Sequence, residues 1–452
     1  MIELARQRVG ATSLAVCVVL LGGCAQQIGT MTLTTPANPV QVAGSALVGR
    51  VRGGQQPVSG ANIQLYAAGG SGYGSAAATL LTSTVQTESD GSFNITSDYT
   101  CPSASTLVYL TATGGNPGLA GNVNNSALTL MAALGQCGAL QSATFINVNE
   151  LTTVAAVWAL SHYMTSYSTI GSSATNSTGL ANAFAAANEV VNLATGAAPG
   201  ASLPTGATLP VTKINSLANI LSACVNSAGG VAGDGSPCGN LFAAATPAGV
   251  SAPVDTMGAA INIARNAGSN VSTIFDLAVP NVPFQPPLSA APTDWLIGIN
   301  YTGGGLNSPK SIAVDGAGNV WLANGGANSV SEFTSGGTAL SPAGGYAGGG
   351  LNVPAAIAID LSGNAWIANS GGNSASELSG SGSALSPAGG FTGGGMSGPE
   401  SISIDGYGDE WLGNHGNNSV TELNSSGAVL SPGTGYTGAG VTMPTGLAVD
   451  PY

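Results

Sequence analysis

Charge is scarce in this 452-residue chain: charged residues make up 6% of it, with 7 Lys and Arg against 20 Asp and Glu. We therefore expect no nucleic-acid partner, because binding phosphate backbones requires clustered cations. Aromatic residues are few, at 5%, and there are only two His. No apolar run after residue 24 reaches the roughly 18 residues that cross a bilayer, which excludes a multispan membrane protein. The apolar content of 44% excludes a disordered chain.

The first residues have the pattern of an export signal. Arg6 and Arg8 precede the apolar segment 11–21, which is too short for a transmembrane helix. The segment ends in Leu-Gly-Gly-Cys at residues 21–24, which resembles the bacterial lipobox. That resemblance implies that residues 1–23 are a lipoprotein signal peptide and that acyl chains on Cys24 anchor the protein in a lipid bilayer.

An ordinary cleaved signal peptide, with Cys24 unmodified, is the alternative. Ala25 stands where an Asp would indicate inner-membrane retention in the lipoprotein sorting rule. The expected location is therefore the cell envelope, at the outer membrane or the cell surface.

Four cysteines remain in the exported part, and an even number in an oxidising compartment favours disulfides. They are Cys101, Cys137, Cys224 and Cys238. No CxxC or His-rich spacing accompanies them, so we expect no metal site. Three pairings are open, and the simplest joins nearest neighbours along the chain.

Composition divides the chain into regions. Residues 24–44 are rich in Thr, Gln and Pro and are expected to form a tether. Residues 45–115 hold short alternating runs between Gly turns, the pattern of a small β-sandwich. The stretches GRVRGGQQPVSGANIQLYAAG and TVQTESDGSFNITS resemble the carboxypeptidase regulatory-like, prealbumin-type module. In that family the module has a stabilising or spacing role and no chemistry of its own.

Residues 116–278 are Ala-rich with helical periodicity, and Asn149 is a candidate helix cap. Trp158 and His162 could share a face of that first helix with Glu150, but no nucleophile, base and orienting acid occur together. We expect His162, beside Trp158 and Tyr163, to be a packed residue and not a catalyst. Residues 279–292, with a cluster of Pro, are expected to form a stiff linker.

An internal repeat of 45 residues follows and is the most specific feature of the sequence. The repeated residues are Trp321, Trp366 and Trp411, and Asp315, Asp360, Asp405 and Asp450. A unit of this size with short alternating strands is typical of one propeller blade. The unit resembles NHL-type and virginiamycin-B-lyase-type β-propeller repeats over residues 293–452. The expected fold is therefore multidomain and mainly β: a prealbumin-like β-sandwich, an Ala-rich helical middle domain and a partial C-terminal propeller.

The repeated positions have structural interpretations. We expect Ile312–Val314 to form a buried inner strand, the repeated Asp to turn the chain, and the repeated Trp to pack between blades. A calcium-binding or channel-lining role for the Asp ring is the alternative. The DxxGN spacing has too few successive oxygen ligands for a calcium loop.

Departures from the repeat are the candidates for chemistry. Glu410, its neighbour Asp409, and His415 occur in one unit only. In virginiamycin-lyase-like propellers a His and a Glu near the channel act as base and metal-binding groups, which makes His415 and Glu410 weak catalytic candidates here. One His is a poor basis for such a site, and we expect neither a bound metal nor a cofactor.

The number of units does not suit a closed ring. Residues 295–300 resemble a lone outer strand, and the chain reaches Tyr452 just after the first expected strand of a fourth unit. Propellers usually have four to eight blades. We expect either a C-terminally truncated propeller, completion by a second chain, or an open arc with an exposed sheet edge.

These features together predict a lipid-anchored bacterial cell-envelope protein that binds an unidentified protein or glycan through its repeats without catalysis. A propeller enzyme of lyase or lactonase type is the first alternative. A purely structural spacer is the second. The fold alone does not choose among them.

Replacing Cys24 with Ala tests the anchor. The wild-type protein, expressed in a cell with the lipoprotein pathway, should carry a lipid-sized mass increment on Cys24 and partition into detergent. Cys24→Ala should lose both, as measured by intact mass and phase separation. A soluble wild-type protein without added mass would contradict the predicted anchor and location.

Overall fold

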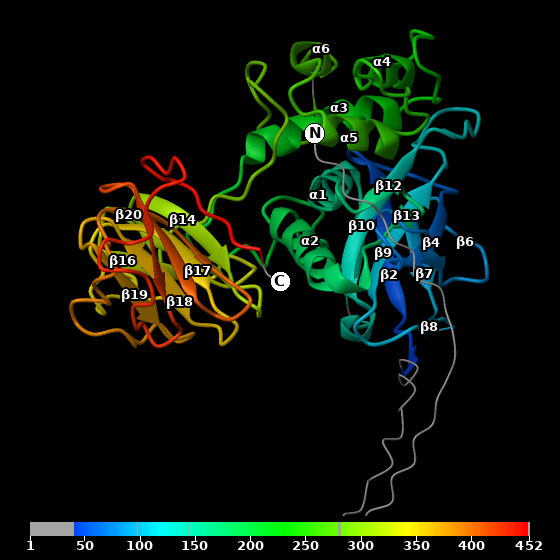
Figure 1. The fold of residues 1–452 in the computed structure, drawn as a ribbon. Coiled ribbons are helices and arrows are strands. Elements are labelled where there is room, and N and C mark those ends of the chain that lie inside the picture. The colour runs from blue at the N-terminus through cyan, green and yellow to red at the C-terminus, as the bar shows by residue number, and fades with distance from the viewer. Residues whose placement is uncertain (1–39, 97, 143, 279–281, 451–452) are drawn as a thin grey trace, which may run out of the picture. The chain divides into compact units, whose positions relative to one another are not determined.

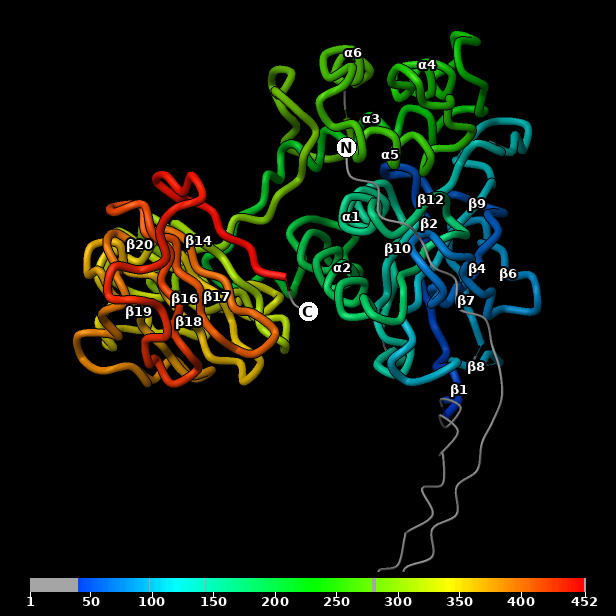
Figure 2. Tube along the Cα trace, in the orientation of Figure 1, coloured from blue at the N-terminus to red at the C-terminus, as the bar shows by residue number. Residues whose placement is uncertain are grey.

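The structure is a computed structural model that describes residues 40–96, 98–142, 144–278 and 282–450. The predicted signal peptide, Cys24 and most of the tether lie outside these residues. The described chain is mainly β, and in chain order it forms two sheets, a helical region and three repeated sheets (Figure 1). The tube in Figure 2 follows the same course. None of the helices within the described ranges has the length and apolar character needed to span a membrane.

Two sheets near the start share one hydrophobic core. The larger contains β4 (Asn62–Ala67), β5 (Ala78–Thr79), β6 (Val85–Gln86), β9 (Leu107–Thr113) and β10 (Thr129–Gln136). The smaller contains β2 (Leu47–Gly53), β3 (Gln56–Pro57), β7 (Ser92–Ile95) and β11 (Phe145–Val148), while β1 (Val42–Ala43) pairs with β8 (Thr100–Cys101). In β2, Leu47 and Val51 are buried and alternate with more exposed residues, as expected for a strand with one face on a core.

The predicted boundary between sandwich and helical domain at residue 115 is wrong. Strand β10 pairs antiparallel with β9, and β11 pairs parallel with β2, so the sheets continue to Val148. Most of β10 is apolar and buried, and a short continuous apolar run has no periodicity that separates strand from helix. A disulfide joins Cys101 at the end of β8 to Cys137 just after β10.

The helical region begins where Asn149 caps α1. The Asn149 side chain accepts from the Thr152 backbone N–H, and the Thr152 side chain accepts from the Asn149 N–H, which together form a capping box. The helices are α1 (Glu150–Leu160), α2 (Ser177–Val190), α3 (Val211–Val225), α4 (Pro237–Ala244), α5 (Thr256–Arg265) and α6 (Val271–Phe275). Two short 3-10 turns (Cys137–Ala139 and Ala174–Asn176) and the hairpin β12 (Met164–Ser166) and β13 (Thr169–Ile170) complete the region.

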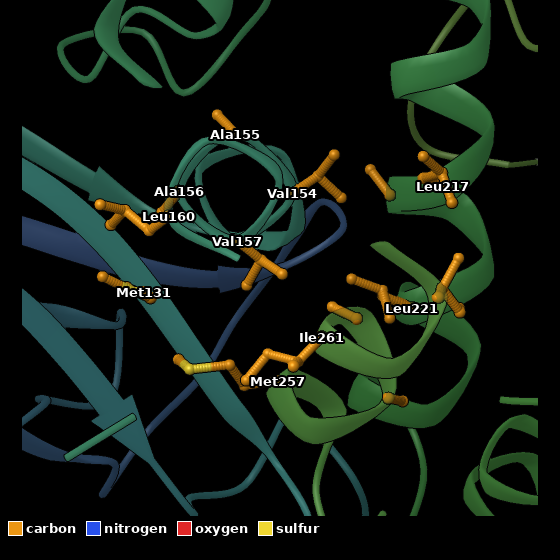
Figure 3. Packing of buried hydrophobic residues seen from close by; sticks show 14 of the residues in the cluster. Met131, Val154, Ala155, Ala156, Val157, Leu160, Leu217, Leu221, Met257 and Ile261 are labelled. Carbon is orange, nitrogen blue, oxygen red and sulfur yellow. The ribbon is translucent and has the colours of Figure 1, made fainter. Parts of the chain in front are cut away.

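Helix α1 is buried on nearly every side, because it packs against β10 and against α2, α3 and α5. In Figure 3, Val154 faces Leu217 of α3 and Val157 faces Met257 of α5. A helix that is apolar all round is expected at the centre of such a cluster. The second disulfide, Cys224–Cys238, ties α3 to α4, so both pairings join nearest neighbours along the chain.

The predicted linker and the predicted lone outer strand both pack onto this helical region. Phe284 is buried, and its N–H donates to the Asn219 side chain on α3. Trp295 is fully buried. Its backbone N–H donates to the Ala267 carbonyl, and its backbone carbonyl accepts from the Trp158 indole. The apolar side chains of both segments complete the helical core, which the sequence interpretation did not predict.

Three antiparallel sheets of three strands each form the repeats. The first repeat sheet contains β14 (Pro309–Val314), β15 (Val320–Asn324) and β16 (Ser329–Phe333). The second contains β17 (Pro354–Ile359), β18 (Ala365–Asn369) and β19 (Ser374–Leu378). The third contains β20 (Pro399–Ile404), β21 (Glu410–Asn414) and β22 (Ser419–Leu423). An aromatic residue after each third strand, at 346, 391 and 436, bridges back to that strand.

Consecutive repeat sheets pack through a recurrent set of side chains. Trp321 of the first sheet lies in one cluster with Ile357 and Ile367 of the second, and Trp366 lies in the next cluster with Ile402 of the third. Residues 441–450, which belong to the fourth unit, form no strand.

Tyr346 and Phe391 also pack against a glycine in the turn after the third strand of the following unit. A Cβ atom added to Gly382 would lie 2.2 Å from the Tyr346 ring, and one added to Gly427 would lie 2.2 Å from the Phe391 ring. These glycines have positive φ angles as well. The contact therefore requires glycine for space and for backbone conformation.

Gly382→Ala tests this packing against a matched control, Gly363→Ala. Both positions have positive φ, 78° and 83°, but nothing lies within 4 Å of a Cβ at Gly363. Gly363→Ala should lower the free energy of unfolding by about 1 kcal/mol through backbone strain. Gly382→Ala should cost roughly 2 kcal/mol more through overpacking against Tyr346, measured by denaturant unfolding. Equal losses at the two positions would contradict the proposed contact.

Candidate functional site

The repeated aspartates close turns and hold the repeated tryptophans. Asp315 Oδ1 accepts from the backbone N–H groups of Ala317 and Asn319, at 2.9 and 2.8 Å. Its Oδ2 accepts from the Trp321 indole at 3.1 Å. Burial opposes ionisation, but the hydrogen bonds from Trp321 and Asn319 hold the pKa of Asp315 below its ordinary value. The Asp315 carboxylate thus accepts hydrogen bonds from residues of its own repeat unit.

The same contacts recur in the next two units. Asp360 accepts from the Trp366 indole at 3.3 Å, and Asp405 accepts from the Trp411 indole at 2.9 Å. Asp450 and Trp411 both line a pocket of about 290 Å³ beside the third repeat sheet. Asp315, Asp360 and Asp405 have the contacts of turn residues.

A second row of acids, which the sequence analysis did not assign, holds the aromatic residues. The Tyr346 hydroxyl donates to Glu332 at 2.9 Å, and the Tyr436 hydroxyl donates to Glu422 at 2.6 Å. Phe391 has no hydroxyl, and the Glu377 carboxylate instead accepts from Asn364 at 3.0 Å. The signal was present, because a Glu recurs at the same step as the Trp and Asp.

The array begins with a variant of this arrangement. Tyr301 packs against Gly337 of the first repeat sheet, as Tyr346 packs against Gly382. Its hydroxyl donates to Glu189 of α2 at 2.7 Å. A helix therefore supplies the acid that a preceding repeat would otherwise supply.

Glu410 is the most unusual carboxylate in the repeats. It begins β21 at the position of Val320 and Ala365, and its side chain is 0% exposed. Neither carboxylate oxygen has a hydrogen-bond partner among the described residues. Burial raises its pKa to about 8, and the negative charges of Glu377, Asp409 and Asp360 act in the same direction. At neutral pH Glu410 is therefore mainly an uncharged acid.

His415 lies at the other end of the same strand. It follows Asn414, the last residue of β21, and its backbone N–H donates to the Gly398 carbonyl. Five residues of extended strand separate Glu410 from His415 by roughly 16 Å. Glu410 and His415 are therefore too far apart to act together on one small substrate. In the part of the chain that the structure describes, no group of three or more His, Cys, Asp or Glu is arranged to hold a metal ion.

The residues considered on the first helix also act separately. Both oxygens of Glu150 accept from the Gly54 N–H, at 2.9 and 3.0 Å. Trp158 donates to the Trp295 carbonyl at 2.7 Å, and His162 is exposed. The expected packing of His162 is therefore wrong, and the three residues form no common site.

Comparison with known proteins finds no matching family profile and no matching curated protein. Among solved structures, the chain is similar to selenomethionine-substituted virginiamycin B lyase from Staphylococcus aureus, with 20% identity, 27% of this chain and 39% of that chain covered, and a TM-score of 0.22. A putative gluconolactonase has 20% identity, 28% and 47% coverage and a TM-score of 0.22. A nidogen/laminin complex has 15% identity, 33% and 54% coverage and a TM-score of 0.26. The lyase and the lactonase are propeller proteins, and the chain spans less than half the length of each.

Replacing Glu410 with Gln tests its buried, uncharged state. Above the ordinary pKa of 4.5 the unfolded chain loses this proton, whereas the folded chain keeps it up to about pH 8. The stability contributed by protonated Glu410 is full below pH 4.5 and falls as the pH rises to about 8. Glu410→Gln should therefore match the wild type near pH 4.5 and exceed it by roughly 4 kcal/mol near pH 8, measured by urea unfolding.

Titrating groups that do not interact with Glu410 cancel in this difference. Glu400→Gln, at an exposed position on β20 of the same sheet, is the control and should show no such pH dependence. A stability difference between Glu410→Gln and wild type that stays constant with pH would rule out a strongly raised pKa for Glu410.

Proposed function

We propose that this chain is an exported, lipid-anchored cell-envelope protein whose repeats bind a partner protein without catalysing a reaction. The observation that carries the proposal is the state of β14 in the first repeat sheet. Ile312 and Val314 on this strand are 63% and 60% exposed, so the predicted burial of Ile312–Val314 is wrong. The residues equivalent to Ile312 in the next two sheets, Ile357 and Ile402, are 6% and 9% exposed.

The cause of this difference is the order of the sheets. Ile357 is covered by Trp321 of the preceding sheet, and Ile402 by Trp366, but β14 has no preceding sheet in the array. Large exposed aliphatic side chains on a flat strand are costly in water and are typical of an interaction surface. A protein partner fits this surface better than a glycan, because its own apolar side chains can bury the two residues.

The positions of Glu410 and His415 favour binding over the lyase or lactonase alternative. A general acid and its partner base must reach the same substrate, and these two residues begin and follow one strand at opposite ends. Glu410 is also sealed from solvent. The third interpretation, a structural spacer, gives no reason for exposed apolar side chains on β14, because a spacer needs no partner at that surface.

Site-specific photo-crosslinking in the native cell envelope tests the proposal. With benzoylphenylalanine at Val314, irradiation should give one defined crosslinked species that contains a second polypeptide, identified by mass spectrometry. The same group at Leu361, which is 93% exposed in a turn of the second unit, is the control and should give none. Absence of a species at Val314 would contradict binding through this face.

A lyase or lactonase activity that is lost in His415→Ala would overturn the non-enzymatic part of the proposal. The anchor has its own test in Cys24→Ala.

A further inference from the structure

A polar pocket outside the repeats lies where the two-sheet region meets the helical region. It has a volume of about 260 Å³. Its wall comes from the end of β2 and the following turn, from the N-terminus of α1, from α3 and from the segment around Phe284. Val40 and the residues after it form one compact unit, so these walls belong to one packed body. The pocket is separate from the β14 surface.

Five amide side chains line the pocket, and each amide nitrogen donates to a backbone carbonyl. Asn149 donates to the Gly196 carbonyl at 2.9 Å, and its oxygen already accepts from the Thr152 N–H. The other four amides are Asn147, Gln285, Asn215 and Gln55. The bonds run from Asn147 to Ala194 at 2.7 Å, from Gln285 to Val282 at 2.9 Å, from Asn215 to Pro286 at 3.1 Å and from Gln55 to Pro283 at 3.3 Å. The four amide oxygens accept no hydrogen bond from the described residues. The wall thus offers several oriented acceptors with unused capacity.

Arg52 lines the same pocket and has no acidic partner among the described residues. Arg50, two residues earlier on β2, pairs with Asp90 at 3.2 Å. Among the described cations only Arg50 and Lys213 pair with an acidic side chain, and the Arg265 guanidinium instead donates to backbone carbonyls. Its guanidinium presents a planar fork of donors that matches a carboxylate.

The remaining electrostatics agree with an anionic group in the pocket. The N-terminus of α1, at Asn149, lies in the wall, and the helix dipole there favours negative charge. The nearby acid Glu150 accepts from Gly54, which also lines the pocket. Burial raises the pKa of Glu150 to about 8, so at neutral pH it is mainly uncharged and repels an anion little.

We propose that this pocket binds a uronic acid, a sugar unit that carries a carboxylate. The carboxylate pairs with the Arg52 guanidinium, and the ring hydroxyls donate to the oxygens of Gln55, Asn147, Asn215 and Gln285. The volume lies just below the roughly 300–1,000 Å³ of pockets for drug-sized ligands, which suits a single sugar unit. A neutral sugar would leave the guanidinium without a partner.

Isothermal titration of the mature, full chain with D-glucuronate tests the site, with D-glucose as the neutral match. D-glucuronate should bind at least tenfold more tightly than D-glucose. Arg52→Gln should weaken D-glucuronate binding roughly tenfold or more, because it removes the charged fork. Arg50→Gln is the matched control on the same strand and should leave the affinity unchanged.

Gln55→Met is a second variant, at an exposed turn position where the fold should tolerate the change. It removes an acceptor while keeping the side-chain length, and should weaken D-glucuronate binding severalfold. Thermal unfolding of each variant checks that it is folded. No saturable binding of D-glucuronate, equal affinity for D-glucose, or unchanged affinity in Arg52→Gln would each overturn the proposal.

Discussion

Each repeat sheet is apolar on both faces and therefore needs a neighbour on both sides. Trp321 and Trp366 fill the two internal interfaces, where they pack against the isoleucines of the next sheet. Burying large side chains of this kind stabilises each interface by several kcal/mol. The same requirement, left unmet before β14, exposes Ile312. The internal packing and the exposed face thus have one cause.

Polar contacts set the geometry of these interfaces. Asp315 fixes the Trp321 indole, and Glu332 fixes the Tyr346 ring that stacks near the same tryptophan. Both acids accept hydrogen bonds from aromatic side chains. Each large ring is therefore held by its polar group, while its faces pack against apolar side chains of the interface. The arrangement explains why charge, although scarce, recurs at fixed steps in the repeats. It also explains the use of Glu189 at Tyr301, where the array starts and no repeat precedes it.

The parts of the fold that were predicted from the sequence are those with a local or periodic signal. The Asn149 cap, the alternation in β7 and the 45-residue step each depend on residues close together or regularly spaced. Strand β10 was missed because a buried, continuous apolar run has no periodicity to interpret. The burial of Trp295 was missed for a different reason. Its partners Trp158 and Ala267 are distant in sequence, and only the packed structure brings them together.

The candidate sites show the same limit more sharply. His415 and Glu410 stood out because they break the repeat. Their residue types, however, do not reveal that they lie at opposite ends of strand β21. The pocket at Arg52 gave no sequence signal, since its wall combines five separate segments and its amides are common residues. What distinguishes four of those amides is how their hydrogen bonds are used: each nitrogen is occupied by a backbone carbonyl and each oxygen is not. A satisfied donor beside an unsatisfied acceptor fixes the polarity of the wall, and that polarity, together with one unpaired guanidinium, specifies a ligand with hydroxyls and one negative charge.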